Sequence, residues 1–156
     1  MRIKTLLVLI AFYTFVKTVP AQTHPYTTED VVGTYTKNHN DSLEKINFGT
    51  VTKLHRSLIL FPDGRFEYHN FRKLQDQKDE NWYARGTWTL NGKVISFSNT
   101  EKDLSMPNTI DLNNTKARFF KKSPRNKSPK KQPTYIQFYQ SENRIIKRLK
   151  LFKTNE

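Results

Sequence analysis

The sequence contains no cysteine among its 156 residues and only five glycines. The missing cysteines exclude a disulfide scaffold, a thiol nucleophile and any thiolate metal site. The five glycines, at positions 33, 49, 64, 86 and 92, are not spaced for a phosphate-cradling loop or for the nucleophile elbow of a serine hydrolase. Because no catalytic constellation emerges from the remaining residues, we expect a protein that is not an enzyme and uses no cofactor.

One extended apolar run lies near the start of the chain. It spans residues 6–16, follows Arg2 and Lys4, and precedes Val19 and Ala21, which are placed as a signal-peptidase site requires. A membrane-spanning helix needs about 20 apolar residues, so the run favours a signal peptide over a retained anchor. We expect cleavage of residues 1–21 and export of residues 22–156 to the periplasm or beyond, without a lipid anchor because no cysteine follows the run.

The exported part is poor in aliphatic side chains and rich in rings. The whole chain is 35% hydrophobic and 13% aromatic, a composition that favours a folded β protein over disorder. Its length suits one domain with a core of its own. We therefore expect residues 22–156 to form a single domain.

Apolar and polar side chains alternate along most of this domain, which is the period of a β-strand. Two turn signals separate such stretches: Pro62-Asp63-Gly64, and Asn91-Gly92, which predicts a two-residue hairpin. We expect strands from residue 31 onward and within 55–61, 65–71, 83–90, 93–98, 109–112, 117–120, 135–139 and 144–152, with a helix as the alternative for the last stretch.

The connections between these stretches are polar. Residues 72–81 are interpreted as a long solvated hairpin tip, and Thr27 followed by Glu29 and Asp30 predicts a short helical turn. About seven to nine short strands in successive hairpins are typical of an antiparallel sandwich or an up-and-down barrel. We therefore expect an all-β fold, an antiparallel up-and-down (meander) β-barrel with a short N-terminal helical turn.

Three stretches resemble the small lipocalin-like domains of secreted bacterial proteins. They are Gly33-Thr34-Tyr35, the stretch 60–68 around Pro62-Asp63-Gly64, and Gly86-Thr87-Trp88 followed by Asn91-Gly92. The resemblance covers residues 31–98, and the later strands fit as additions to it. It implies a calycin-type barrel with an apolar interior open at one end, and a binding or inhibitory module rather than an enzyme.

Aromatic side chains on the inner face of such a barrel are the first candidate ligand site. They are Tyr35, Phe66, Tyr68, Trp88 and Phe97. The first hypothesis is therefore a non-enzymatic binding protein whose ligand is a small apolar molecule in the barrel or a protein partner at its rim. Small barrels are also filled by their own side chains, which is the alternative to a hollow interior.

Positive charge is concentrated in the last quarter of the chain. The formal net charge is +13, and residues 116–156 contain 13 basic and two acidic side chains. The densest part is a basic loop, residues 116–133, which includes Lys116, Arg118, Lys121, Lys122, Arg125, Lys127, Lys130 and Lys131. Ser123-Pro124 and Ser128-Pro129 predict an extended path for this loop, because the residue before a proline is driven out of the helical region.

The second hypothesis follows from this loop. A protein outside the cytoplasm with such a cluster is predicted to bind polyanions of the cell envelope, either lipid phosphates or anionic polysaccharide, through residues 116–131. No specific nucleic-acid partner is expected. Phe119-Phe120 would add rings to such a site, or would belong to a strand beside a solvated loop.

The histidine and acidic side chains are weaker candidates for a functional site. His55 and His69 flank the predicted hairpin, and with Glu67 they have the donor types of a Cu²⁺ or Zn²⁺ site. We interpret them instead as exposed polar side chains, because no further ligand accompanies them, and we expect no metal site. The acidic pairs Glu29-Asp30 and Asp79-Glu80 lie in polar stretches and are interpreted as solvated.

Overall fold

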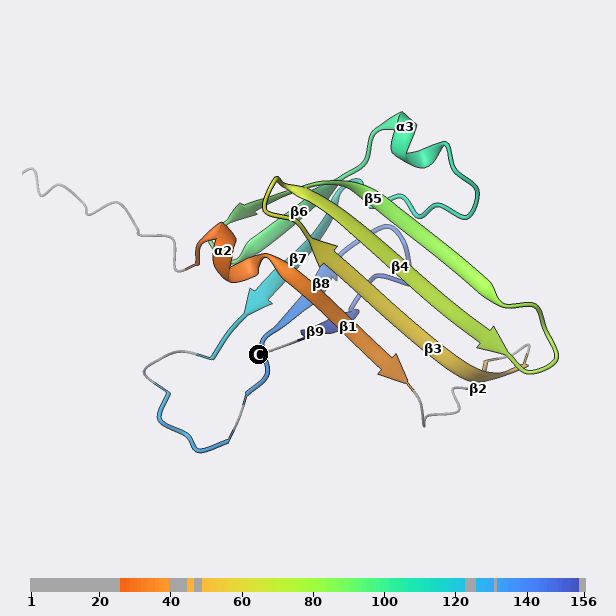
Figure 1. Cartoon of the computed structure of the whole chain (residues 1–156), viewed down its shortest axis with the longest axis horizontal. Coiled ribbons are helices and arrows are strands. Elements are labelled where there is room, and N and C mark those ends of the chain that lie inside the picture. The colour runs from red at the N-terminus through yellow and green to blue at the C-terminus, as the bar shows by residue number, and fades with distance from the viewer. Residues whose placement is uncertain (1–25, 40–44, 47–48, 123–125, 131, 155–156) are drawn as a thin grey trace, which may run out of the picture.

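A computed structural model describes residues 26–39, 45–46, 49–122, 126–130 and 132–154 (Figure 1). The predicted leader, residues 1–21, lies outside this part of the chain. The elements in chain order are α2 (Thr28–Val31), β1 (Gly33–His39), β2 (Lys45–Ile46), β3 (Gly49–Leu60), β4 (Arg65–Leu74), β5 (Glu80–Asn91), β6 (Val94–Ser98), α3 (Glu101–Leu104), β7 (Thr115–Phe120), β8 (Tyr135–Gln140) and β9 (Lys150–Lys153).

Eight of these strands close into a barrel. Each strand from β3 to β9 pairs antiparallel with the next along the chain, and β1 fills the gap by pairing with both β3 and β9. The short β2 pairs with β3 alone and stays outside the ring. The prediction of an all-β antiparallel meander barrel is confirmed.

Both predicted turns join neighbouring strands. Across the first turn Leu60 faces Phe66, and the Arg65 N–H donates to the Asp63 carboxylate at 3.0 Å. Asn91 faces Val94 across the second turn. Gly64 has a φ of +83°, which its lack of a Cβ permits. The backbone conformation of this turn therefore explains why position 64 is a glycine.

The predicted helical turn is confirmed as α2. Its N-cap is Thr27, whose side chain accepts from the Asp30 N–H while the Asp30 carboxylate accepts from the Thr27 N–H, a capping box. Figure 1 shows α2 at the end of the barrel where β1 begins. Val31 is fully buried, so the turn anchors the start of the domain to the core.

The α2 turn makes stability sensitive to acid. Hydrogen bonding to the Thr27 backbone, and then to Lys121 at 2.9 Å, lowers the pKa of the Asp30 carboxyl below its usual 3.8. A lowered pKa contributes stability above the unfolded pKa, and that contribution is lost as the pH falls through the folded value.

We therefore expect the free energy of unfolding to decrease below about pH 3.8, and the Asp30→Asn variant to show a flatter decrease in the same range. Urea unfolding at a series of pH values measures both curves. Parallel curves for the two proteins would contradict this role of Asp30, whereas a remaining slope in the variant is expected from Asp103, whose pKa is also lowered, first by the Thr100 backbone.

The structure departs from the sequence prediction between β4 and β5. Residues 72–81 are not a free tip, because β4 continues to Leu74 and β5 begins at Glu80. Arg72 pairs with Glu80 across the strands, and its Nη2 lies 2.5 Å from the Glu80 carboxylate. Leu74 is buried with Val51 and Leu54 in a small second cluster. Arg72 and Glu80, two of the charges that suggested a solvated loop, are thus cross-strand partners, and the exposed connection is confined to residues 75–79.

Two other predicted strands differ. Residues 109–112 make only an isolated parallel bridge, Thr109 with Tyr83, although Ile110 and Leu112 are buried. The last predicted strand is shorter than 144–152, because turns occupy residues 144–148 and β9 begins at Lys150. Both stretches contain apolar residues that are buried although they lie in loops or turns. Their sequence pattern was therefore the same as that of a strand.

Helix α3 was not predicted. It begins with a second capping box, in which the Thr100 side chain accepts from the Asp103 N–H and the Asp103 carboxylate accepts from the Thr100 N–H. It begins a connection that runs beside β5, as Figure 1 shows in green above that strand. The Ile110 N–H donates to the Tyr83 carbonyl at 2.7 Å, and the Tyr83 N–H donates to the Asn108 carbonyl at 3.0 Å. This connection therefore covers the edge that β5 would otherwise expose.

Candidate functional site

The five rings predicted as an interior ligand site all lie in the barrel core. Tyr35, Phe66, Tyr68, Trp88 and Phe97 are between 0 and 4% exposed. Phe97 contacts Phe66 edge to face, with ring centroids 5.1 Å apart, and Phe138 in a stacked arrangement at 5.4 Å. The rings therefore pack on one another and belong to one hydrophobic cluster.

Three of these five residues, Tyr35, Tyr68 and Trp88, carry a polar atom that needs a partner. The Tyr35 hydroxyl donates to the Val31 carbonyl at 2.5 Å, and the Trp88 Nε1–H donates to the Phe61 carbonyl at 3.1 Å. The Tyr68 hydroxyl is buried and makes no hydrogen bond in the described part of the chain. Burial raises the pKa of the Tyr68 hydroxyl, and the nearby Arg56 charge opposes that rise.

The strand register stacks the inner side chains into rows. One row, here called the apolar row, consists of Tyr35, Leu58, Tyr68 and Ala84 on β1, β3, β4 and β5. Two residues further along the same strands lies the polar row, Lys37, Arg56, Asn70 and Trp82. Because side chains alternate between the two faces of a sheet, both rows lie on the same face. The interior therefore changes from apolar to polar between one row and the next.

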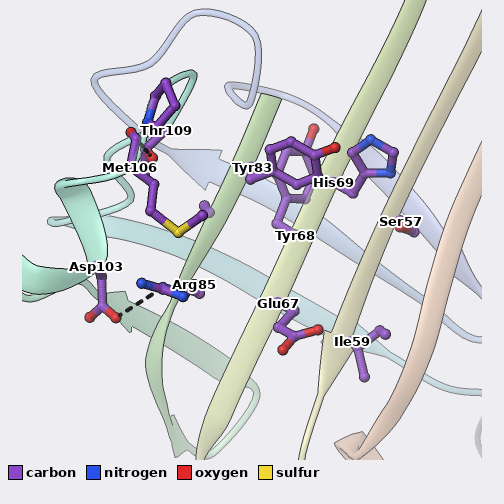
Figure 2. A pocket seen from close by; sticks show the side chains of 12 residues that line it. Ser57, Ile59, Glu67, Tyr68, His69, Tyr83, Arg85, Asp103, Met106 and Thr109 are labelled. Atoms are coloured by element: carbon purple, nitrogen blue, oxygen red, sulfur yellow. Dashed lines mark hydrogen bonds and ion pairs between the residues drawn. The ribbon is translucent and has the colours of Figure 1, made fainter. Parts of the chain in front are cut away.

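A pocket that the sequence did not predict lies on the outer wall of β3, β4 and β5. It has a volume of about 290 Å³, and Figure 2 shows Asp103 and Met106 facing Arg85 and Tyr83 across it. The Asp103 carboxylate lies 3.6 Å from Arg85, and the His69 ring stacks on Tyr83 with centroids 4.7 Å apart. No sequence signal reveals this pocket, because it depends on where the α3 connection packs.

The predicted polyanion residues are divided between a strand and a loop. Lys116 and Arg118 point outward from β7, in alternation with buried Ala117 and Phe119. Lys121 pairs with Asp30, and the Lys122 ammonium donates to the Ser128 carbonyl at 2.7 Å. Lys127 and Lys130 are exposed, whereas Arg125 and Lys131 lie outside the described residues.

Rings accompany these cations on the outer surface. Phe120 stacks on Tyr135 with centroids 4.6 Å apart, and Tyr135 contacts Phe152 at 6.1 Å, so the three form a row across β7, β8 and β9. The Lys150 ammonium lies 3.6 Å from the centre of the Tyr135 ring, and Arg118 lies 4.7 Å from that of Tyr139. Of the Phe119-Phe120 pair, only Phe120 reaches this surface.

We call this surface the cationic face. It consists of Lys116, Arg118, Phe120, Lys121, Lys122, Tyr135, Tyr139, Lys150 and Phe152. A groove of about 370 Å³ crosses it, lined by residues that include Phe120, Lys122, Tyr135 and Lys150. Phe120 was predicted as a possible addition to this site, whereas Lys150, Tyr135, Tyr139 and Phe152 were not predicted as site residues. The signal that identifies them is the alternation with buried residues, which puts Tyr135 and Tyr139 of β8 and Lys150 and Phe152 of β9 on the outer face.

The two histidines lie on the outer wall of adjacent strands, but not opposite each other. His55 faces Phe71, and His69 faces Ser57. The ring nitrogens already have partners, His55 Nδ1 with Asn38 and His69 Nε2 with Asn81 at 2.9 Å. Among the described residues, no group of three or more histidine or acidic side chains is arranged to hold a metal ion.

Comparisons with known proteins assign this chain to no family. No protein-family model matches it, and no curated protein matches it. In the part of the chain that the structure describes, none of the helices has the length and apolar character needed to cross a bilayer. The geometry of the barrel and its surfaces is therefore the basis for inferring a function.

Proposed function

We propose that this protein is a non-enzymatic binding module that holds an anionic polysaccharide on its cationic face. The observation that carries the proposal is the set of cations without counter-charges on that face. Lys116, Arg118, Lys122 and Lys150 form no ion pair with any described residue. Like charges held together on a folded surface repel one another, and a polyanion removes that repulsion while releasing its own counterions.

The rings beside these cations favour a polysaccharide over a lipid surface. Phe120, Tyr135 and Phe152 are all partly buried, and they lie against one another on the sheet. Insertion into a membrane interface requires apolar side chains that protrude into it, and these do not protrude. A row of rings packed on the sheet and flanked by cations fits a chain whose units offer both apolar faces and negative charges.

The test removes four charges from the cationic face and compares the result with a matched loss elsewhere. In the first variant Lys116, Arg118, Lys122 and Lys150 become glutamine. In the control, Lys53, Lys73, Lys78 and Lys102 become glutamine, which changes the net charge equally on β3, β4, the β4–β5 connection and α3. The readouts are retention on immobilised heparin and the salt dependence of heparin affinity.

The cationic-face variant should bind heparin at least about tenfold more weakly at low salt, with a shallower salt dependence, because fewer counterions are released. The control should keep most of the affinity. Equal losses in the two variants would mean that net charge alone holds heparin, and the proposal would fail. Vesicles of anionic phospholipid bound more tightly than heparin by the unaltered protein would favour the lipid alternative.

Export to the periplasm or beyond remains an expectation, and the proposal is consistent with it because anionic polysaccharides occur there. The interior apolar ligand also stays a prediction. Since Tyr35, Phe66, Tyr68, Trp88 and Phe97 fill the core, an apolar molecule among them would have to displace side chains that already contact one another.

A further inference from the structure

We propose that the outer pocket, the space between the outer wall of β3, β4 and β5 and the connection after α3, binds a small organic amine. The amine is protonated and carries an apolar group. Glu67 supplies the counter-charge, and Tyr83 and Met106 supply the apolar contacts. None of these residues belongs to the cationic face, so the inference does not depend on the polysaccharide proposal.

The floor of the outer pocket is part of the barrel wall. Two outward-facing rows of the sheet form it: Ile59, Glu67 and Arg85, and beside them Ser57, His69 and Tyr83. Each row crosses β3, β4 and β5, so the pairing of the strands fixes the spacing of its side chains. The floor is therefore formed before a ligand arrives.

The connection after α3 forms the raised side of the pocket. The Tyr83 N–H donates to the Asn108 carbonyl, and the Tyr83 carbonyl accepts from the Ile110 N–H. The Thr109 hydroxyl donates to the Met106 carbonyl at 2.5 Å and fixes the turn that contains Met106, which Figure 2 shows beside the floor. The volume of about 290 Å³ is close to the lower end of the range for small-molecule sites, which indicates a small ligand.

Apolar side chains are exposed at this pocket. Tyr83 is 48% exposed and Met106 is 52% exposed, and they are two of the four large hydrophobic side chains exposed in the described part of the chain. A single exposed apolar side chain is ordinary, whereas two that face each other across a pocket form a surface that a ligand can cover. An apolar group between Tyr83 and Met106 removes both side chains from water.

The charges that line the pocket favour a cation. Arg85 lies opposite Glu67 in the strand register, but its Nε is 3.6 Å from the Asp103 carboxylate. Glu67 forms no ion pair with a described residue. The described lining residues thus carry two carboxylates and one guanidinium, in a protein whose formal net charge is +13. An anionic ligand would meet this excess of negative charge, and a neutral ligand would leave Glu67 without a partner.

The two rings of the floor add to this preference. His69 stacks on Tyr83 with the ring planes 6° from parallel. The Asn81 side-chain oxygen can only accept, so His69 Nε2 donates to it at 2.9 Å and the ring is held in place. The face of a tyrosine ring is negative and attracts an ammonium group. Carboxylate, ring face and thioether together therefore select a protonated amine with an apolar group.

The test is a nuclear magnetic resonance titration of the isotope-labelled full chain with 2-phenylethylamine at neutral pH. The comparison ligands are 2-phenylethanol, which lacks the charge, and ethylamine, which lacks the ring. The variants are Glu67→Gln, Met106→Ala and Arg85→Gln. The matched controls are Glu142→Gln and Ile145→Ala, which remove an exposed carboxylate and an exposed apolar side chain from the β8–β9 connection.

The amine should shift the backbone amides of Glu67, Tyr83 and Met106, and should bind about fivefold more tightly than either comparison ligand. In Glu67→Gln the advantage of the amine over the alcohol should disappear. Met106→Ala should weaken binding of the amine and the alcohol alike. Arg85→Gln should strengthen binding of the amine alone, about threefold, because it removes a cation from the pocket. Both controls should bind like the unaltered protein.

Three results would overturn the proposal. One is that 2-phenylethylamine shifts no amide of the outer pocket. Another is that amine and alcohol bind the unaltered protein equally, which would make the pocket a purely apolar site. The third is that Glu142→Gln lowers the affinity for the amine as much as Glu67→Gln, so that net charge alone attracts it. Glu67 and Met106 are both exposed, so these variants should keep the fold, and heparin binding by the unaltered protein tests the cationic face separately.

Discussion

Replacing Gly86 by alanine is expected to destabilise the barrel by about 3 kcal/mol, more than the same replacement at Gly64. A Cβ atom at Gly86 would overlap the backbone carbonyl oxygen of Ser98 and lie 3.1 Å from Cε1 of Phe66. Backbone cannot rotate away as a side chain can, so β5 and β6 would have to separate where the interior is already filled.

Gly64 provides the matched comparison. A Cβ there would meet only the Trp88 carbonyl oxygen at 3.6 Å, an ordinary contact, and the cost comes from the φ of +83°. That conformation costs a non-glycine residue about 1–2 kcal/mol. Denaturant unfolding of Gly86→Ala and Gly64→Ala measures the difference. A loss at position 86 no greater than that at 64 would show that β5 and β6 are not as close as described.

Replacing Trp88 by alanine should cost about 3–5 kcal/mol, which approaches the whole stability of a small domain. Trp88 is 4% exposed and belongs to the main core cluster, so its removal leaves a cavity surrounded by packed side chains. Trp88→Phe is the control, because it loses the hydrogen bond to the Phe61 carbonyl but keeps a ring.

For Trp88→Phe we expect a loss of about 1–2 kcal/mol, from one hydrogen bond and a smaller ring. Far-ultraviolet circular dichroism during thermal unfolding follows both variants without relying on tryptophan fluorescence. A hollow barrel would give a different result, because Trp88→Ala would then enlarge an existing space and cost little more than Trp88→Phe.

Side-chain alternation predicted the wall of the barrel well. Phe66 and Tyr68 were assigned to the inner face and Glu67 and His69 to the outer face from the period of two alone, and the register agrees. The hairpin at Asp63-Gly64 was equally predictable, because its backbone geometry demands those residue types. Local chemistry determines these features, so a single sequence reveals them.

Features that depend on distant contacts were not predictable. Arg72 and Glu80 look like loop residues until the register places them opposite each other. The outer pocket exists only because Met106 packs near Tyr83, and nothing local specifies that approach. The polar row is a similar case, since Lys37, Arg56 and Asn70 come from three strands.

The cationic face lies between these two cases. The basic segment was evident from charge alone, but the sequence extended it through residues 116–131 as one loop. In the structure Lys116 and Arg118 project from β7, and their aromatic neighbours Tyr135 and Tyr139 come from β8. Charge density therefore located the segment, and strand pairing placed the rings of β8 beside it.

The most direct test of the account is a nuclear magnetic resonance titration of the isotope-labelled protein with a sulfated oligosaccharide. We predict that the largest shifts fall on the backbone amides of Arg118, Phe120, Tyr135 and Lys150, with a weaker response at higher salt. Shifts of similar size at Lys53, Lys73 and Lys102, or none on β7, β8 and β9, would contradict a specific polyanion site on the cationic face.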